Sequence, residues 1–154
     1  MPEKAQDRSP VSASPASGYA GDVSVNEAWR LLVEDPVAVL VDVRTMAEWM
    51  YVGTPDLTSI AKIPLFIEWQ TFPDRTLNPD FLGQLARSIP DKDATVLFIC
   101  RSGARSASAA MMATAKGYAR SYNIAEGFEG DPDRARHRGT NGGWKAKGLP
   151  WVQS

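Results

Sequence analysis

The 154-residue chain has few of the residues on which several common functions depend. It has one cysteine, Cys100, which excludes an intramolecular disulfide and argues against a cysteine-rich zinc site. It has one histidine, His137, so a metal site built on a pair of histidines is excluded. The 17 Lys and Arg are balanced by 18 Asp and Glu, and this lack of basic excess argues against generic nucleic-acid binding.

Long apolar segments are also missing. No run approaches the ~18 apolar residues that cross a membrane. The first 21 residues contain no apolar core of the kind found in secretory signals. We therefore expect a cytoplasmic protein that binds neither membranes nor nucleic acid.

The length corresponds to one domain. Residues 1–22 combine proline and serine without an apolar period, which predicts a flexible N-terminal tail. The domain is predicted over residues 23–152, and its last part, from residue 126, is rich in glycine and predicted to consist mostly of loops.

The pattern within the domain predicts an α/β fold. Continuous apolar runs typical of buried strands occupy residues 37–41 and 95–99, and short strands are predicted over residues 61–65 and 121–124. Helices are predicted over residues 25–34, 45–51, 78–90 and 106–116, with capping-box spacings at Ser24 and Thr45. Residues 66–75 are apolar without a period, so we predict an ordered loop there. Because apolar strands alternate with helices, the sheet is expected to be parallel.

Cys100 follows one predicted strand directly, and open parallel sheets bind ligands at this end of their strands. The loop Arg101-Ser102-Gly103-Ala104-Arg105 then leads into a helix. Such a loop directs backbone N–H groups into one concavity, where the helix dipole and both arginines add positive charge. This environment favours the thiolate, which is the nucleophilic form. The alternative is a small, inert cysteine buried at a strand end.

Several motifs resemble, in order and spacing, those of rhodanese-like domains, the family of single-domain thiosulfate sulfurtransferases. They are Asp42-Val43-Arg44, Glu48-Trp49, Ile63-Pro64, Cys100 to Ser106, Gly127-Phe128-Glu129-Gly130 and Gly148-Leu149-Pro150-Trp151. The resemblance covers residues 23–152. It implies the rhodanese-like fold, a five-stranded, mostly parallel sheet flanked by helices.

The resemblance also implies a reaction. Cys100 would take a sulfur atom from a donor such as thiosulfate, become a persulfide, and pass the sulfur to cyanide, a cellular thiol or a protein acceptor. The backbone of residues 101–105 would hold the persulfide, with Arg101 and Arg105 contacting the anionic donor. No metal or cofactor is expected. The physiological donor and acceptor and the oligomeric state stay open.

Two other functions are alternatives to sulfur transfer. Phosphatases and arsenate reductases of this fold have one more residue between cysteine and arginine than the four that separate Cys100 from Arg105, so the shorter loop favours sulfur as the cargo. A non-enzymatic module that senses sulfur or redox state, or binds a partner, is the main alternative. Ser106 is predicted to be the N-cap of the following helix.

Three charged residues in the first motif are expected to support the site. Asp42, Arg44 and Glu48 are predicted to form a structural ion pair, in which Arg44 bridges Asp42 or Glu48; the alternative places them near the active loop.

Two aromatic residues and the histidine are further candidates for the site. Trp69 and Phe72 are candidates for lining the pocket, with simple packing as the alternative. His137 lies in a charged stretch within residues 131–143 and is predicted to occupy a surface loop rather than to act in catalysis.

Overall fold

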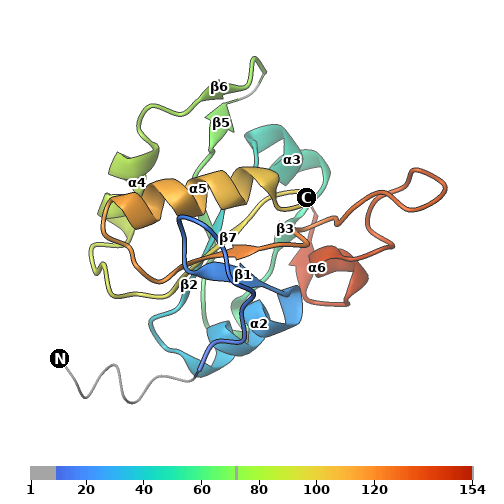
Figure 1. The fold of residues 1–154 in the computed structure, drawn as a ribbon. Coiled ribbons are helices and arrows are strands. Elements are labelled where there is room, and N and C mark those ends of the chain that lie inside the picture. The colour runs from blue at the N-terminus through green and yellow to red at the C-terminus, as the bar shows by residue number, and fades with distance from the viewer. Residues whose placement is uncertain (1–9, 72, 154) are drawn as a thin grey trace.

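The fold, given by a computed structural model that describes residues 10–71 and 73–153, is built on a five-stranded sheet (Figure 1). The strand order is β1-β8-β7-β2-β4, and every neighbouring pair is parallel. The strands are β1 (Gly21–Val23), β2 (Val39–Asp42), β4 (Leu65–Phe66), β7 (Val96–Ile99) and β8 (Ser121–Ile124). The predicted α/β fold with a parallel sheet is therefore confirmed.

Helices cover both faces of the sheet. They are α2 (Val25–Glu34), α3 (Met46–Tyr51), α4 (Phe81–Ser88), α5 (Ala104–Ala115) and α6 (Gly143–Ala146), with a 3-10 turn, η1 (Thr58–Ile60). In Figure 1, α4 and α5 lie on one side of the sheet and α2 lies on the other. Burial on both faces explains why β7, at the centre of the sheet, is apolar throughout rather than alternating.

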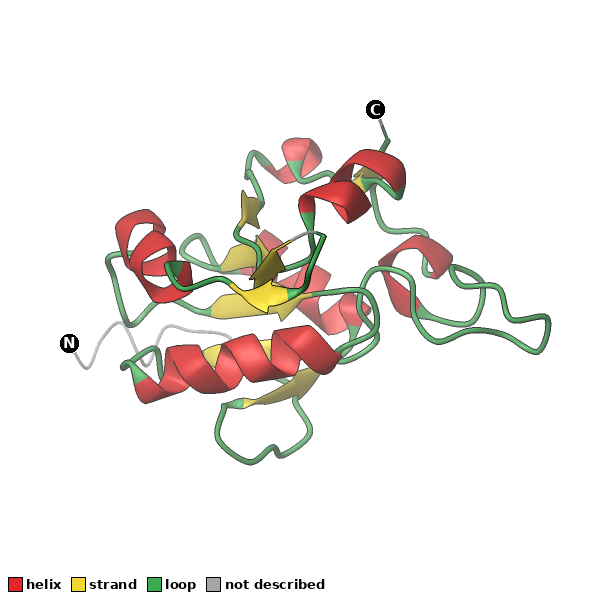
Figure 2. Cartoon of the chain, turned by 90° about the horizontal axis from the view of Figure 1, so that it is seen from above, coloured by secondary structure: helices red, strands yellow, loops and turns green. Residues whose placement is uncertain are grey.

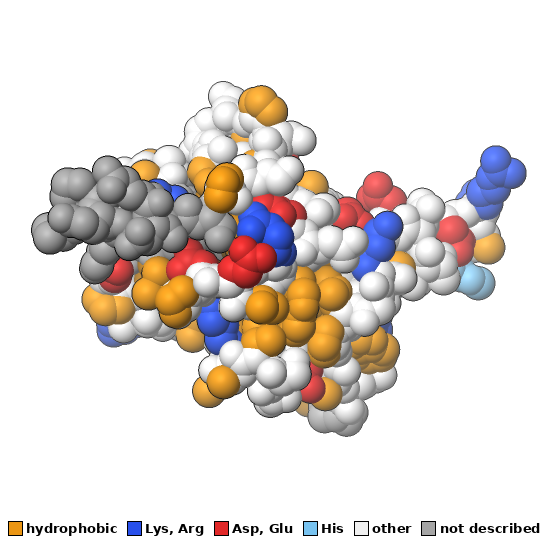
Figure 3. All heavy atoms as spheres, turned by 90° about the horizontal axis from the view of Figure 1, so that it is seen from below, with side chains coloured by type: hydrophobic (Ala, Val, Ile, Leu, Met, Phe, Trp, Pro, Cys, Tyr) orange, Lys and Arg blue, Asp and Glu red, His pale blue; other side chains and the backbone are white. Residues whose placement is uncertain are grey.

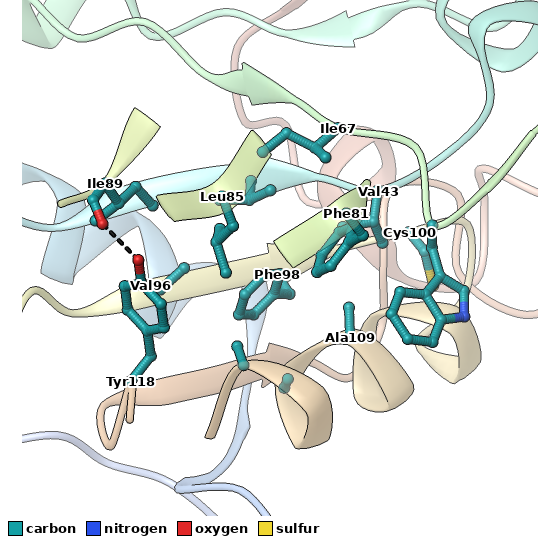
Figure 4. Packing of buried hydrophobic residues seen from close by; sticks show 14 of the residues in the cluster. Val43, Ile67, Phe81, Leu85, Ile89, Val96, Phe98, Cys100, Ala109 and Tyr118 are labelled. Atoms are coloured by element: carbon teal, nitrogen blue, oxygen red, sulfur yellow. Dashed lines mark hydrogen bonds between the residues drawn. The ribbon is translucent and has the colours of Figure 1, made fainter. Parts of the chain in front are cut away.

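Two apolar clusters fill the space between the sheet and its helices. In the first, Phe98 of β7 packs with Phe81 and Leu85 of α4 and Ala109 of α5 (Figure 4). In the second, Leu97 and its strand neighbours pack against α2. Residues Val96 to Ile99 are all inaccessible to solvent. Their burial fixes the position of β7, which ends directly before Cys100.

Two short antiparallel pairs lie outside the main sheet. Strand β3 (Thr54–Pro55) pairs with β9 (Trp151–Val152), and β5 (Gln70–Thr71) pairs with β6 (Thr76–Leu77). Strand β5 lies within residues 66–75, the segment predicted as a loop, and β6 follows directly after it. The loop between β8 and α6 projects from the body in Figures 1 and 2, and Figure 3 shows side chains of both charges along it.

The N-terminal segment differs from the predicted flexible tail over residues 1–22. Strand β1 joins the sheet edge, and Ser14 forms a bridge with Asp22. The Ser12 amide donates to the Glu27 carboxylate at 2.8 Å, and the Arg30 guanidinium donates to the Pro10 carbonyl at 2.6 Å. Residues 10–22 are thus held by backbone and polar contacts together with Val11 and Tyr19, which pack against the two apolar clusters. Two isolated apolar side chains leave no apolar period in the sequence. Residues 1–9 lie outside the described part of the chain.

The strand predicted over residues 61–65 is displaced toward the C-terminus. Ile63 is 80% exposed, and Ala61 has a left-handed φ of 57°. Pairing with β2 begins only at Leu65, which lies opposite Val41. Pro64 lacks a backbone donor, which fits its position just before the strand.

Candidate active site

Strand β7 carries Cys100 to the carboxyl edge of the sheet. Its last residue, Ile99, lies opposite Asp42 at the end of β2, so the two strand ends bring their loops together. Helix α5 begins at Ala104, with Gly103 as its N-cap residue. The Cys100 Sγ atom lies 3.1 Å from the Gly103 amide nitrogen and 3.1 Å from the Ser106 hydroxyl. The loop therefore provides the sulfur atom with two hydrogen-bond donors.

A cleft of about 620 Å³ opens beside this sulfur atom. Cys100 is only 1% exposed, yet it is among the residues that line the cleft. The predicted loop residues Arg101, Ser102, Ala104 and Arg105 line it too. The thiol is therefore buried at the base of a cleft rather than enclosed by apolar side chains on all sides, as an inert cysteine would be.

Glycines allow a second segment to lie directly against the active loop. Gly103 has a φ of +108°, and a Cβ atom there would lie 2.3 Å from the Ala125 carbonyl oxygen. Gly127 has a φ of +71°, and its Cβ would lie 2.4 Å from the Arg101 carbonyl oxygen. The Phe128 amide donates to the Cys100 carbonyl at 2.8 Å. Contacts this close explain why both motifs contain glycine at these positions.

Arg105 forms an ion pair with Glu48 across the cleft. Its Nη1 and Nη2 atoms lie 2.6 and 2.9 Å from the two carboxylate oxygens of Glu48. Burial raises the pKa of Glu48, but the hydrogen bonds and charge of Arg105 outweigh this and lower the pKa overall. Burial likewise lowers the pKa of Arg105, whereas the hydrogen bonds and charge of Glu48 raise it, with a net increase. The guanidinium is thus already bound to a carboxylate in the structure.

Asp42 and Arg44 form a second ion pair, with both side chains fully buried. The Arg44 Nη2 atom donates to Asp42 at 2.7 Å and to the Gly53 carbonyl at 2.8 Å. Its guanidinium also lies 4.2 Å from the centre of the Phe128 ring. Arg44 therefore holds together the end of β2, the chain after α3 and the segment docked on the active loop. This arrangement fits the predicted structural pair with Asp42, whereas Glu48 binds Arg105.

Trp69, a candidate for lining the pocket, is not among the residues that line the cleft. Its amide donates to the Val43 carbonyl at 3.1 Å, and its ring packs edge to face on Phe81 in the core. Three other residues of the same segment line the cleft in place of Trp69, namely Gln70, Pro73 and Arg75. Packing, the alternative interpretation of Trp69, fits the structure, while Phe72 lies outside the described residues.

Several residues of the site were not assigned to it from the sequence. Ser106 is not the predicted N-cap, because α5 begins two residues earlier and places the Ser106 hydroxyl against the thiol. Asn123 was predicted to lie in a strand and was given no role in the site. A polar residue in a buried strand nevertheless indicates a specific hydrogen-bond partner. Arg75 and Arg138 line the cleft from loops whose paths carry no local signal. His137 is exposed, as predicted, and does not line the cleft.

Neither a metal-ligand cluster nor a membrane-spanning helix is found within residues 10–71 and 73–153. No three His, Cys, Asp or Glu side chains there are grouped so that they could hold a metal ion. No helix in the same ranges has the length and apolarity needed to cross a membrane.

Comparisons with known proteins cover nearly the whole chain. Residues 20–154 match the family model described as the STR4 middle domain. The crystal structure of Rv0390 from M. tuberculosis is 47% identical with a TM-score of 0.82, and the match covers 88% of this chain and 99% of that one. The chloroplastic protein Thylakoid rhodanese-like of Oryza sativa subsp. indica is 31% identical over 89% of this chain, which corresponds to 26% of that protein.

A more distant structural neighbour has the same fold. The polysulfide-sulfur transferase homodimer of Wolinella succinogenes has a TM-score of 0.57 at 24% identity, and the match covers 86% of this chain and 78% of that one. The family match includes the five-stranded sheet and the Cys100 loop. The chain belongs to the STR4 middle domain family, within the rhodanese-like superfamily.

Proposed function

We propose that this protein is a sulfurtransferase that carries sulfane sulfur as a persulfide on Cys100. The observation that carries the proposal is the position of the chain's single cysteine. It lies at the carboxyl end of β7, its Sγ atom accepts a hydrogen bond from the Gly103 amide, and it lines the cleft. Hydrogen-bond donors and positive charge around a sulfur atom favour its reactive thiolate form, and the cleft gives a small donor a route to this buried thiol.

The proposed reaction has two steps, in which the sulfur atom moves without a redox cofactor. The Cys100 thiolate attacks the outer sulfur of thiosulfate; a new S–S bond forms as the old one breaks, and sulfite leaves with the electron pair. The terminal sulfur of the persulfide is then negatively charged, and the N–H groups at the start of α5 face that charge. Cyanide or a thiolate acceptor attacks this terminal sulfur and releases the Cys100 thiolate.

The charges around the cleft assign different roles to the two loop arginines. Arg105 is held by Glu48 through two hydrogen bonds, so its role is to fix α3 against the loop and to keep positive charge near the sulfur. Arg101 is exposed at the cleft, where it can meet an anionic donor directly. Arg75 and Arg138 line the same cleft and add to the attraction of anions.

The chemical identity of the sulfur donor is a separate, more specific part of the proposal. Thiosulfate is one donor that the resemblance to rhodanese-like domains implies. The distant neighbour described as a polysulfide-sulfur transferase supports testing polysulfide alongside it. A panel of donors, scored by persulfide formation on Cys100, would identify the best one.

The test is steady-state turnover of the purified full-length chain with thiosulfate or polysulfide as donor and cyanide as acceptor, measured as thiocyanate. We expect turnover for the wild type and for His137→Ala, whose exposed side chain lies outside the residues that line the cleft. Cys100→Ser should lose it while keeping the wild-type circular dichroism spectrum. Absence of thiocyanate with every donor, or turnover by Cys100→Ser, would overturn the proposal; hydrolysis of p-nitrophenyl phosphate would instead indicate a phosphatase.

A further inference from the structure

Buried polar groups lead from the Cys100 sulfur atom away from the cleft. The Ser106 hydroxyl of α5 lies 3.1 Å from Sγ and 2.5 Å from the Asn123 Oδ1 atom of β8. Asn123 Nδ2 donates to the Asp22 carboxylate of β1 at 2.9 Å, and the Tyr19 hydroxyl donates to the same oxygen at 2.8 Å. Ser106 is 0% exposed and Asn123 is 4% exposed, so bulk water does not bathe the inner part of this chain.

The contact with Asp22 fixes which way the Asn123 amide faces. A carboxylate can only accept hydrogen bonds, so the NH₂ group of Asn123 faces Asp22 and the carbonyl oxygen faces Ser106. The Ser106 hydroxyl has a single proton. Two acceptors, Asn123 Oδ1 and the Cys100 thiolate, lie within reach of that proton.

We propose that Asn123 is a positioning residue that restrains ionisation of Cys100 by competing with the thiolate for the hydroxyl proton of Ser106. In the thiol form, the S–H group donates to the Ser106 oxygen, and Ser106 donates to Asn123, so every group is satisfied. When the thiol loses its proton to water in the cleft, Ser106 turns its own proton to the sulfur. The Ser106 and Asn123 oxygens then face each other at 2.5 Å with no proton between them, which is unfavourable.

This competition would affect sulfur transfer itself, and that consequence rests on the proposed function. Formation of the persulfide moves the negative charge from Sγ to the terminal sulfur. Ser106 can then return its proton to Asn123, which removes the unfavourable contact. Asn123 therefore favours the persulfide over the free thiolate as the resting form of the enzyme once a donor is present.

The test compares Ser106→Ala with Asn123→Ala in the full-length chain, using the rate of alkylation by iodoacetamide as a function of pH. The chain has one cysteine, so the signal has a single source. Loss of the Ser106 donor should move the midpoint of the profile up and slow alkylation below the midpoint about tenfold. Loss of the Asn123 oxygen should move the midpoint down and speed alkylation there by up to about tenfold.

Two controls separate ionisation from other effects. The rate on the alkaline plateau, where every thiol is ionised, reports access to the sulfur. Asn123→Leu has a similar volume to the natural residue and should shift the midpoint as Asn123→Ala does. The variants leave in place the charged residues that line the cleft with Cys100, which are Arg75, Arg101, Arg105, Arg138, Glu48 and Glu129. They also leave the buried pair of Asp42 and Arg44, and Asp22 at the far end of the polar chain.

The outcomes distinguish this inference from the proposed function. Opposite shifts of the two midpoints would support the competition, even in a protein that fails to form thiocyanate. Shifts in the same direction, or no shift in either Asn123 variant, would overturn it, even in a protein that transfers sulfur efficiently.

Discussion

The contact between the active loop and the chain after β8 makes substitution of Gly103 a stringent test of the site's geometry. Replacement by alanine would place a Cβ atom 2.3 Å from the Ala125 carbonyl oxygen, at a φ of +108°. That oxygen belongs to a backbone held in place by the bond from the Ala125 amide to the Val23 carbonyl. The positive φ costs about 1–2 kcal/mol for a residue with a side chain, and overpacking costs about 1–3 kcal/mol. We therefore expect Gly103→Ala to lower the free energy of unfolding by about 2–5 kcal/mol.

Gly148 provides a matched control. Its φ is +76°, and among the described residues no atom lies within 4 Å of the position of a Cβ. Gly148→Ala should therefore cost only the backbone strain, about 1–2 kcal/mol. The difference between the two variants isolates the contact with Ala125.

The assay is equilibrium unfolding in urea of the wild type and both variants. Domains typically have about 5–15 kcal/mol of stability, so both variants should remain folded enough to measure unless the wild type is at the lower end. Because the Gly103 amide donates to the Cys100 sulfur, Gly103→Ala should also slow alkylation of the thiol relative to Gly148→Ala. Equal losses of stability in the two variants would refute the close packing described for this loop.

Four further predictions concern the polar contacts of the fold. Glu48→Gln and Arg105→Gln should show a coupling energy of about 0.5–3 kcal/mol in a double-mutant cycle of unfolding. The pKa of Glu48 is lowered in the folded state. Ionised Glu48 therefore contributes its full stabilisation above the unfolded pKa of about 4.3, and this stabilisation is lost as the pH falls through the lower folded pKa. Wild type and Glu48→Gln should have converging free energies of unfolding as the pH falls through that range. Asp42→Ala leaves Arg44 buried without its carboxylate and should cost about 3–5 kcal/mol in the same unfolding assay. Ser24→Ala removes the side chain that caps α2 and should cost about 0.5–2 kcal/mol, measured as a lower urea midpoint.

Local signals in the sequence were sufficient to locate much of the sheet and its helices. Ser24 accepts from the Glu27 amide as a capping residue, and α2 spans the predicted residues 25–34. Thr45 and Glu48 form both bonds of the predicted capping box at the start of α3. Strands β2 and β7 were found because buried central strands form continuous apolar runs, a pattern that needs no knowledge of the partner strand.

Features that depend on distant partners could not be predicted in this way. Strand β1 has only three residues and is defined by pairing with β8, about 100 positions later. The partner of Glu48 proved to be Arg105, 57 positions away, although Arg44 lies much closer in the sequence. Ser106 looked like a helix cap from its local spacing, but the helix begins at Ala104, which turns the Ser106 hydroxyl toward Cys100. The role of this serine therefore depends on where the helix begins, and not on its residue type alone.

The most direct test of the central claim is the mass of the intact protein after incubation with a sulfur donor. A chain that acts through a Cys100 persulfide should gain the mass of one sulfur atom, and should lose it again when cyanide is added. Cys100→Ser should gain nothing under the same conditions. An unchanged mass of the wild-type chain with every donor, or an equal gain in Cys100→Ser, would contradict the account.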